Sequence, residues 1–256
     1  IKFREFLDHA DRLGAKYIAT GHYAQIDSNP TALSLLKGND PSKDQSYFLY
    51  TLGQAELQHT LFPIGTMLKS EVRQIARSLG MPNADRKDST GICFIGERRF
   101  RDFLARYLPP SPGQICTLDD TVIGEHQGLW FYTLGQRHGL NIGGPGDAWY
   151  VAAKDMSRNV LRVVQGHDHP ALMRDSAQAE ELSWVENDPP QFPFRCSAKT
   201  RYRQADQACT LSRIGPDKIE ITFEQPQRAI TPGQALVLYD GSRLIGGGVF
   251  CDLING

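Results

Sequence analysis

The sequence contains no run of 18 apolar residues, which excludes a transmembrane helix. It also has no excess of positive charge, because 28 Lys and Arg residues stand against 29 Asp and Glu residues. Any nucleic-acid surface must therefore be a local patch. Cysteines are few and scattered: five in 256 residues, with no Cys-x-x-Cys pair and no histidines at zinc spacing. This pattern favours free thiols in a reducing compartment.

The composition, 40% hydrophobic and 22% charged, is typical of a globular protein. The length of 256 residues allows two or three domains. The nearest approach to a metal-binding pattern is His167-Asp168-His169, which a polar turn before Pro170 explains more simply. The first residue, Ile1, already lies inside an amphipathic helical pattern, so we expect a fragment of a longer protein.

Cys93 is the first candidate for chemistry. It lies in a loop of small residues directly ahead of a predicted helix from Glu97 to about Leu108. The unpaired N–H groups and the dipole of a helix N-terminus favour the thiolate, and two nearby arginines would add to that field. Its apolar neighbours Ile92 and Phe94 equally suit a buried, unreactive thiol. The residue types alone leave both interpretations open.

The first 80 residues show an α/β pattern. An amphipathic helix is predicted over 2–13, with Gly14 as its stop. A buried parallel strand is predicted over 17–20, and ligands bind at the carboxyl ends of such strands. The loop Lys43-Asp44-Gln45 offers groups that could hold a phosphate or a base edge, or it is a solvated loop with a helix cap. Further elements are a strand at 33–36, a helix at 46–52, and a helix at 69–79 with its apolar residues inward.

Beyond Gly113 the pattern changes to short strands. We predict strands at 114–117, 129–133, 149–154 and 160–165, with a hairpin turn at 155–159. Six later segments alternate well enough to predict a closed antiparallel barrel: 178–185, 194–203, 207–214, 218–224, 234–239 and 243–250. On 194–203 the residues Lys199, Arg201 and Arg203 would share one face. That face is either a solvated surface or an RNA-binding one.

Six motifs, in order along the chain, resemble those of the tRNA-specific 2-thiouridylases of the MnmA/TrmU family. They are Ala19-Thr20-Gly21-His22-Tyr23, Lys43-Asp44-Gln45-Ser46-Tyr47-Phe48-Leu49, Ser89-Thr90-Gly91-Ile92-Cys93-Phe94-Ile95-Gly96-Glu97, Thr133-Leu134-Gly135-Gln136-Arg137, Lys199-Thr200-Arg201-Tyr202-Arg203 and Thr231-Pro232-Gly233-Gln234.

The resemblance implies an α/β PP-loop ATPase domain, of the adenine nucleotide alpha hydrolase type and partial here, then a β-rich central domain and a C-terminal antiparallel β-barrel. We expect the ATPase domain to comprise residues 1–56 and 88–111. The central domain would comprise residues 57–87 and 112–168, and the barrel residues 169–256. The implied activity is the ATP-dependent 2-thiolation of the wobble uridine of tRNA, through adenylation of the base and a cysteine persulfide. The resemblance implies ATP as the cofactor, accompanied by Mg²⁺. It implies no metal bound by the protein itself.

Site residues follow from the same resemblance. Cys93 matches the persulfide-bearing cysteine, and Gly21 matches an ATP contact. Seven residues match tRNA contacts: His22, Lys43, Asp44, Gln45, Arg201, Tyr202 and Gln234. The implied partners are the anticodon stem-loop of tRNA and a protein that donates persulfide sulfur. The resemblance also implies a monomeric enzyme in the cytoplasm.

Two parts of the family pattern are absent from residues 1–256: the phosphate-binding Ser-Gly-Gly-x-Asp-Ser loop and the partner cysteine. We therefore expect that the isolated chain neither hydrolyses ATP nor completes thiolation, although its full-length parent does. The alternative is a non-catalytic RNA-binding module that retains the barrel. A thiol enzyme that pairs Cys93 with His22 is a third reading, but the sequence shows no orienting third group.

Overall fold

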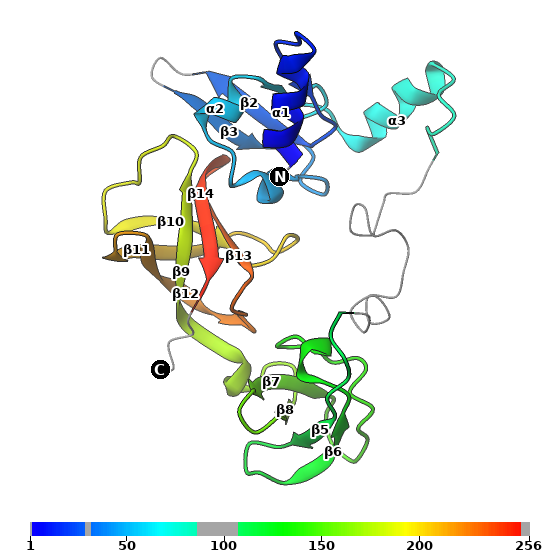
Figure 1. The fold of residues 1–256 in the computed structure, drawn as a ribbon, viewed down its shortest axis with the longest axis vertical. Coiled ribbons are helices and arrows are strands. Elements are labelled where there is room, and N and C mark those ends of the chain that lie inside the picture. The colour runs from blue at the N-terminus through cyan, green and yellow to red at the C-terminus, as the bar shows by residue number, and fades with distance from the viewer. Residues whose placement is uncertain (1, 29–31, 86–106, 252–256) are drawn as a thin grey trace. The chain divides into compact units, whose positions relative to one another are not determined.

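The computed structural model describes residues 2–28, 32–85 and 107–251 (Figure 1). Its contacts divide the chain into two units. The first comprises Ile1–Lys87, Ser176–Gln225 and Pro232–Ile254, and the second comprises Asp88–Asp175, Pro226–Thr231 and Asn255–Gly256. No helix in the described ranges combines the length and hydropathy needed to cross a membrane. The three domain boundaries expected from the sequence stay a prediction.

The N-terminal part of the first unit is a small α/β assembly. Its elements are α1 (Lys2–Arg12), β1 (Ile18–Ala19), η1 (Ser46–Leu49), α2 (Gln54–Leu57), β4 (Thr60–Leu61) and α3 (Lys69–Ser78). Gly14 has a φ of +75° just after α1, the left-handed conformation of a helix stop, so the predicted helix and its end are confirmed. β1 pairs in parallel with β4, which confirms the predicted parallel strand.

The rest of the first unit is dominated by a closed barrel of six antiparallel strands, as predicted. They are β9 (Met173–Trp184), β10 (Phe194–Lys199), β11 (Gln207–Gly215), β12 (Lys218–Arg228), β13 (Ala235–Asp240) and β14 (Arg243–Phe250). The sheet runs β13-β10-β11-β12-β9-β14, and the pairing of β13 with β14 closes it. The expected strand 194–203 ends early, because Thr200 donates from its N–H and its hydroxyl to Oε1 of Gln204 and starts a turn.

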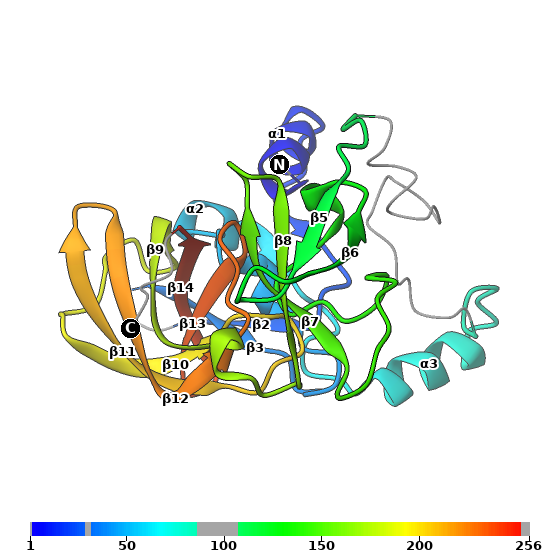
Figure 2. The ribbon, with the colours of Figure 1, turned by 90° about the horizontal axis from the view of Figure 1, so that it is seen from below.

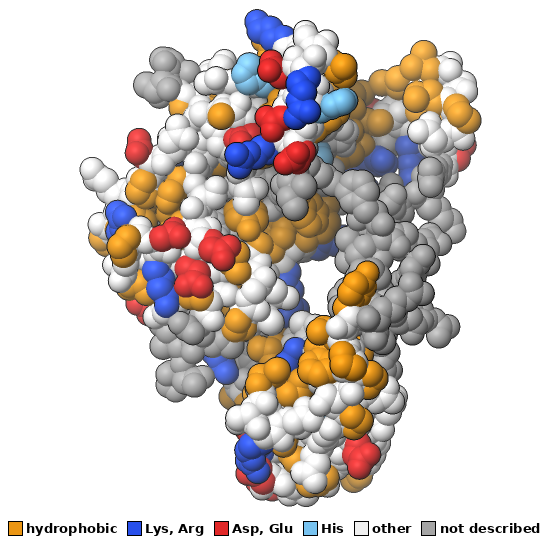
Figure 3. Space-filling model, viewed as in Figure 1, with side chains coloured by type: hydrophobic (Ala, Val, Ile, Leu, Met, Phe, Trp, Pro, Cys, Tyr) orange, Lys and Arg blue, Asp and Glu red, His pale blue; other side chains and the backbone are white. Residues whose placement is uncertain are grey.

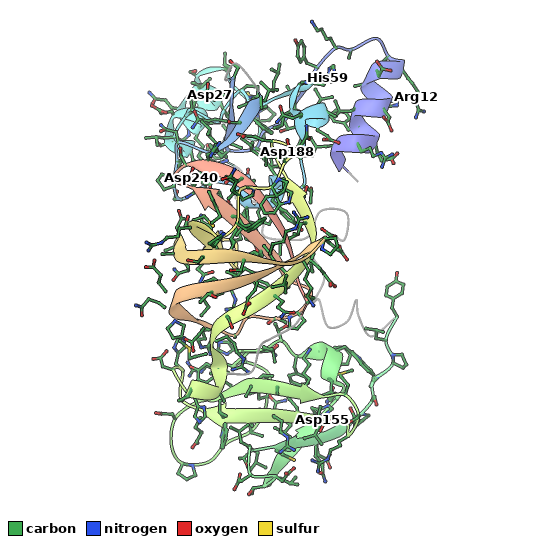
Figure 4. All side chains as sticks on the ribbon, turned by 90° about the vertical axis from the view of Figure 1, so that its left-hand side faces the viewer. Arg12, Asp27, His59, Asp155, Asp188 and Asp240 are labelled. Carbon is green, nitrogen blue, oxygen red and sulfur yellow. The ribbon has the colours of Figure 1, made fainter. Side chains whose placement is uncertain are left out.

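A hairpin that the barrel pattern did not predict extends this sheet. β2 (Ala24–Ser28) and β3 (Leu33–Lys37) pair with each other, and β3 pairs with β14 at Leu35 and Leu36 (Figures 1 and 2). On one edge of β14, β3 pairs with the first residues of the strand and β9 pairs with the later ones. Asp240, at the end of β13 (Figure 4), accepts a hydrogen bond from Arg243, the first residue of β14.

One hydrophobic core joins the N-terminal part to the barrel. Its buried residues come from both: Ala24, Leu35, Tyr47, Leu49, Leu52, Leu57, Val185, Val237, Tyr239 and Leu244. Gln54 adds a polar link, because its amide group donates to the carbonyl oxygens of both Leu33 and Val185. The first unit is thus a single packed body and not two independent domains joined by a linker.

The second unit contains a four-stranded sheet in the order β6-β5-β8-β7, with β5 parallel to β8. Its elements are β5 (Gly113–Cys116), β6 (Val122–His126), η2 (Leu129–Phe131), β7 (Trp149–Asp155), β8 (Val160–Gln165) and η3 (Pro170–Leu172). The strand predicted at 129–133 is wrong, since residues 129–131 form a 3-10 helix after Gly128, whose φ is 142°. The hairpin between β7 and β8 is confirmed, with Asp155 at its turn (Figure 4).

α3 departs from its sequence pattern. Its predicted inward face includes Ile75 and Leu79, but these side chains are 47% and 70% exposed. Figure 3 shows hydrophobic side chains along this helix. A helical period predicts an apolar stripe without saying what covers it. The predicted inward packing is therefore wrong within the described residues.

Candidate functional site

Gly21 and His22 follow β1, at the carboxyl edge of the strand where the sequence predicts a ligand. Gly21 is exposed, and a Cβ added there would meet no described atom within 4 Å. Nδ1 of His22 lies 2.8 Å from Oγ1 of Thr20, and its ring packs on Phe3 and Phe62. The histidine is therefore held in place beside an accessible stretch of backbone.

Asp44, in the predicted Lys43-Asp44-Gln45 site, is buried and already engaged. Its Oδ1 accepts hydrogen bonds from the backbone N–H groups of Gly38 and Ser46, at 3.0 and 3.1 Å. Its Oδ2 accepts one from the hydroxyl of Ser46 at 3.1 Å. A carboxylate with these partners fixes the loop, and a contact of Asp44 with tRNA stays a prediction.

The two neighbours of Asp44 are more open. Lys43 and Gln45 are both partly exposed. Gln45 uses its side-chain oxygen to accept from the backbone N–H of Tyr23, which ties this loop to the segment after His22. Just before it, Asp40 accepts from the backbone N–H of Lys69 and from Ser42, and these bonds lower the pKa of its carboxyl group. The loop is thus anchored at both ends.

Alternating charges connect this loop to the barrel. The Nζ of Lys199, on β10, lies 3.7 Å from Oδ2 of Asp44 and 3.7 Å from Oδ1 of Asp206. Asp206 also forms an ion pair with Lys37, on β3. Both ammonium groups lie over the ring of Tyr239, at 4.3 Å for Lys37 and 5.4 Å for Lys199. Lys199 is therefore an internal connection, and the prediction that it shares an exposed face with two arginines is wrong.

An aromatic cluster lies next to these charges. The rings of Phe48 and Tyr202 have centroids 4.4 Å apart, and Tyr47 packs against both, at 5.5 and 6.1 Å. Phe48 is 54% exposed. Tyr47 is buried, and burial raises its pKa to about 12, so its hydroxyl stays protonated and donates to the carbonyl oxygen of Ala235. The cluster thus joins η1, the turn after β10 and the start of β13.

Arginines flank the aromatic cluster. Arg201 and Arg203 are exposed on the turn after β10, and the guanidinium of Arg203 lies 5.9 Å from the centre of the Tyr202 ring. Arg201 acts electrostatically on Tyr47, since its charge opposes the rise in the pKa of that phenol. Only Phe48 of the aromatic pair is exposed, since Tyr202 is partly buried against the core. An exposed aromatic ring beside cations is the combination that stacks and neutralises a single-stranded nucleic acid.

Gln234 immediately precedes β13 and so lies next to Ala235, the acceptor of the Tyr47 hydroxyl. Its Oε1 is buried and has no hydrogen-bond partner in the described part of the chain. A buried polar atom without a partner costs free energy, which a ligand donor would recover. Of the predicted tRNA contacts, this is the one with an unused acceptor.

The structure thus brings Tyr202, and Ala235 next to Gln234, into contact with Tyr47 from segments far apart in the sequence. Lys43 and Gln45 shortly precede Tyr47 along the chain. Cys93, with the loop and helix predicted around it, lies outside the described residues. His167 and His169 make local hydrogen bonds, to Asp168 and from the N–H of Ala171. Within the described ranges, no three His, Cys, Asp or Glu residues are grouped as metal ligands.

The motif Thr133–Arg137 has a structural role in the second unit. Gly135 donates its N–H to Val151 on β7, and its carbonyl oxygen accepts from Arg228. Arg228 also donates to the carbonyl oxygen of His167 and lies 4.9 Å from the centre of the Tyr150 ring. A later segment of the chain therefore holds this motif against the sheet.

Comparison with known proteins identifies the family. Residues 1–97 match the family described as tRNA methyl transferase HUP domain, residues 101–165 the tRNA methyl transferase PRC-barrel domain, and residues 174–250 the Aminomethyltransferase beta-barrel domain. The tRNA-specific 2-thiouridylase MnmA of Alkalilimnicola ehrlichii is 57% identical over 254 residues, which cover 97% of this chain and 69% of that protein. This chain belongs to the MnmA family. The relative from Nitrosomonas europaea is 56% identical, covering 97% and 70% of the two chains, and that from Ralstonia nicotianae is 58% identical, covering 97% and 68%.

The MnmA assignment confirms both the resemblance and the expected fold class, an α/β part followed by β-rich domains.

The sequence did not single out three residues of the site: Lys37, Phe48 and Asp206. The sequence signal for Phe48 was its place in the Lys43–Leu49 motif, while its exposure is seen only in the structure. No local signal marks Lys37 or Asp206, since their pairing depends on β3 lying beside the barrel.

Proposed function

We propose that this chain carries the tRNA-binding surface and the sulfur-transferring cysteine of an MnmA enzyme, which replaces the C2 oxygen of the wobble uridine of tRNA by sulfur. One observation carries the proposal: the exposed Phe48 packs on the partly buried Tyr202, next to the exposed Arg201 and Arg203, in the segment that follows the predicted contacts Lys43 and Gln45. The relatives, named tRNA-specific 2-thiouridylases, support the same substrate.

The surface around Phe48 would hold tRNA in two ways. The aromatic rings offer a stacking surface for an unpaired base, and the arginines neutralise adjacent phosphates. The Oε1 of Gln234, which has no hydrogen-bond partner in the described part of the chain, is a further acceptor that we assign to the RNA. Asp44 and Lys199 keep the loop and the barrel in register beneath it. These contacts position the anticodon region, whose wobble uridine must leave the stack to react.

Cys93 is the residue that we propose carries sulfur. As a persulfide, its outer sulfur would attack C2 of the uridine while the activated C2 oxygen leaves. The partner cysteine, which is not among these 256 residues, would then attack the inner sulfur, so that the S–S bond breaks, the outer sulfur stays on C2 and Cys93 is left in a disulfide with the partner. The activation is the chemistry that ATP supplies when it is bound. Gly21 fits an ATP contact, because its backbone is exposed at the carboxyl end of a parallel strand with no described side chain in the way. Mg²⁺ would accompany the nucleotide.

The phosphate-binding loop and the partner cysteine are not among these 256 residues, so we infer that the isolated chain binds tRNA without thiolating it. The four described cysteines are free thiols, which supports a reducing cytoplasmic location. Thiouridine formed in vitro by the isolated chain with ATP, a persulfide donor and unmodified tRNA would overturn this inference.

The binding surface is tested with Phe48→Ala and Arg201→Ala in tRNA-binding titrations at several salt concentrations. Loss of one stacked base weakens binding by about 5-fold to 150-fold, because base–aromatic stacking is worth about 1–3 kcal/mol. Loss of one phosphate contact lowers the slope of log K against log salt by about one. Tyr17→Ala is the matched control, since Tyr17 is also an exposed aromatic beside a cation, Lys16. Equal effects of Phe48→Ala and Tyr17→Ala would refute the surface.

The cysteine is tested in cells. A strain whose genomic copy carries Cys93→Ser should contain no 2-thiouridine in its tRNA, as measured by mass spectrometry of nucleosides, while the purified variant binds tRNA as the parent does. Cys116→Ser is the control, because Cys116 is buried on β5 of the second unit. Normal thiolation in the Cys93→Ser strain would favour the alternative, a non-catalytic RNA-binding module.

A further inference from the structure

Two cysteines that the proposed sulfur transfer does not use face each other in the barrel. Cys196 on β10 and Cys209 on β11 are direct partners in the antiparallel register. Directly opposed residues project to the same face of a sheet, with Cα atoms about 4.5–5.5 Å apart. Their Sγ atoms lie 3.7 Å apart in a thiol–thiol hydrogen bond. Disulfides form at Cα separations of about 4.4–6.8 Å, so the strands already have the required spacing.

We propose that Cys196 and Cys209 form an oxidisable dithiol, which a small disulfide such as oxidised glutathione converts into a cross-strand disulfide. Neither cysteine is among the residues proposed to contact tRNA or to carry sulfur. Its strands enclose the turn that carries Arg201 and Tyr202, so the crosslink closes the loop from 196 to 209 around that turn.

The order of the two reactions follows from exposure. Cys196 is partly exposed, whereas Cys209 is 1% exposed. Cys196 attacks one sulfur of oxidised glutathione, which forms a mixed disulfide and releases one glutathione. The Cys209 sulfur, already in contact with Sγ of Cys196, then displaces the second glutathione. Overall, two protein thiols lose two hydrogen atoms, and one glutathione disulfide is reduced to two glutathione molecules.

The resting state of the pair is two thiols. The hydrogen bond with Cys209 and burial raise the pKa of the Cys196 thiol, and the nearby Asp240 carboxylate acts in the same direction. Because the thiolate is the attacking species, oxidation at neutral pH is slow. This accounts for a pair that stays reduced in a thiol-rich compartment and is crosslinked under sustained oxidation.

The test exploits the positions of basic residues around the pair. The folded chain, in a Cys93→Ser background, is incubated with oxidised glutathione, alkylated and digested with trypsin without reduction. Cleavage after Arg195, Lys199, Arg203 and Arg213 places Cys196 in peptide 196–199 and Cys209 in peptide 204–213. The expected product is these two peptides joined, two hydrogen atoms lighter than their sum.

Two single variants assign the steps. Cys209→Ser should accumulate glutathione on Cys196, whereas Cys196→Ser should leave Cys209 unmodified because it is buried. The oxidised chain should also unfold at a higher urea concentration than the reduced chain, and neither single variant should show this shift. The proposal is overturned if the native chain carries glutathione on Cys196 with Cys209 free, or if the crosslink forms only in urea.

Discussion

Lys199 and Asp44 provide a measurable test of how the barrel is attached to the predicted tRNA-binding loop. The perturbation is a double-mutant cycle of Lys199→Met, Asp44→Asn and both changes. The side chains of these residues are 13% and 6% exposed, and their charged atoms are 3.7 Å apart. The matched exposed pair is Arg77 and Asp85, which are 59% and 75% exposed but only 2.7 Å apart.

Distance alone predicts a stronger coupling for Arg77 with Asp85, which are closer together. Burial predicts a stronger coupling for Lys199 with Asp44, because water screens their charges less. At about 4 Å, two unit charges attract by about 1 kcal/mol in water but by about 4 kcal/mol at an effective dielectric constant of about 20. Exposed pairs measured by such cycles give about 0.2–1 kcal/mol. We therefore expect a coupling energy of about 2 kcal/mol for Lys199 with Asp44, reduced from the upper figure because Lys199 also pairs with Asp206.

The assay is urea unfolding followed by the fluorescence of Trp184, which lies on β9 of the first unit. Trp130 and Trp149, in the second unit, are replaced by Phe so that one unit alone is observed. The cycle is repeated in 1 M NaCl, which should abolish the coupling of Arg77 with Asp85 and leave most of that of Lys199 with Asp44. The reasoning is refuted if the buried pair couples no more strongly than the exposed one.

Three further outcomes follow from burial and close packing. Leu35→Ala, in the core shared by the hairpin and the barrel, should cost the first unit about 2–5 kcal/mol in urea unfolding. Gly38→Ala should cost about 1–3 kcal/mol in the same assay, because a Cβ there lies 2.6 Å from the carbonyl oxygen of Tyr23. In the second unit, burial lowers the pKa of His126 below the usual 6.5, so the unfolded chain takes up this proton first as the pH falls. Stability should therefore decrease as the pH falls through 6.5 and level off below the folded-state pKa, and His126→Gln should remove this component of urea unfolding measured between pH 7.5 and 5.

Local patterns predicted the elements whose determinants are local. The alternation in 218–224 and the hairpin turn at 155–159 specify strands and a turn through neighbouring residues, and both occur. The end of β10 depends instead on the side chain of Gln204, which bonds back to Thr200. The helix α3 was predicted correctly, but the burial of its apolar face was not. The periodicity at Ile75 and Leu79 indicates a helix and does not tell which part of the protein, if any, covers that face.

For the site, the motifs named candidate residues, but they did not indicate which contacts these side chains make in the fold. Asp44 was expected to contact RNA, yet its oxygen atoms are occupied by Gly38, Ser46 and Lys199. Phe48 was not singled out, although it is the exposed aromatic of the same motif. Roles such as these depend on contacts between segments distant in sequence, which a motif does not encode.

The ladder between β3 and β14 has a consequence for how the protein is made. The paired residues Leu36 and Arg243 are separated by roughly 200 residues, so the ribosome finishes the hairpin long before its partner strand exists. At about 5–20 residues per second, that interval is about 10–40 s. During it, Ala24, Leu35 and Tyr47 have no barrel to pack against, and the edge of β3 is open to other chains. A nascent chain of this protein should therefore depend on chaperones until its last strand emerges.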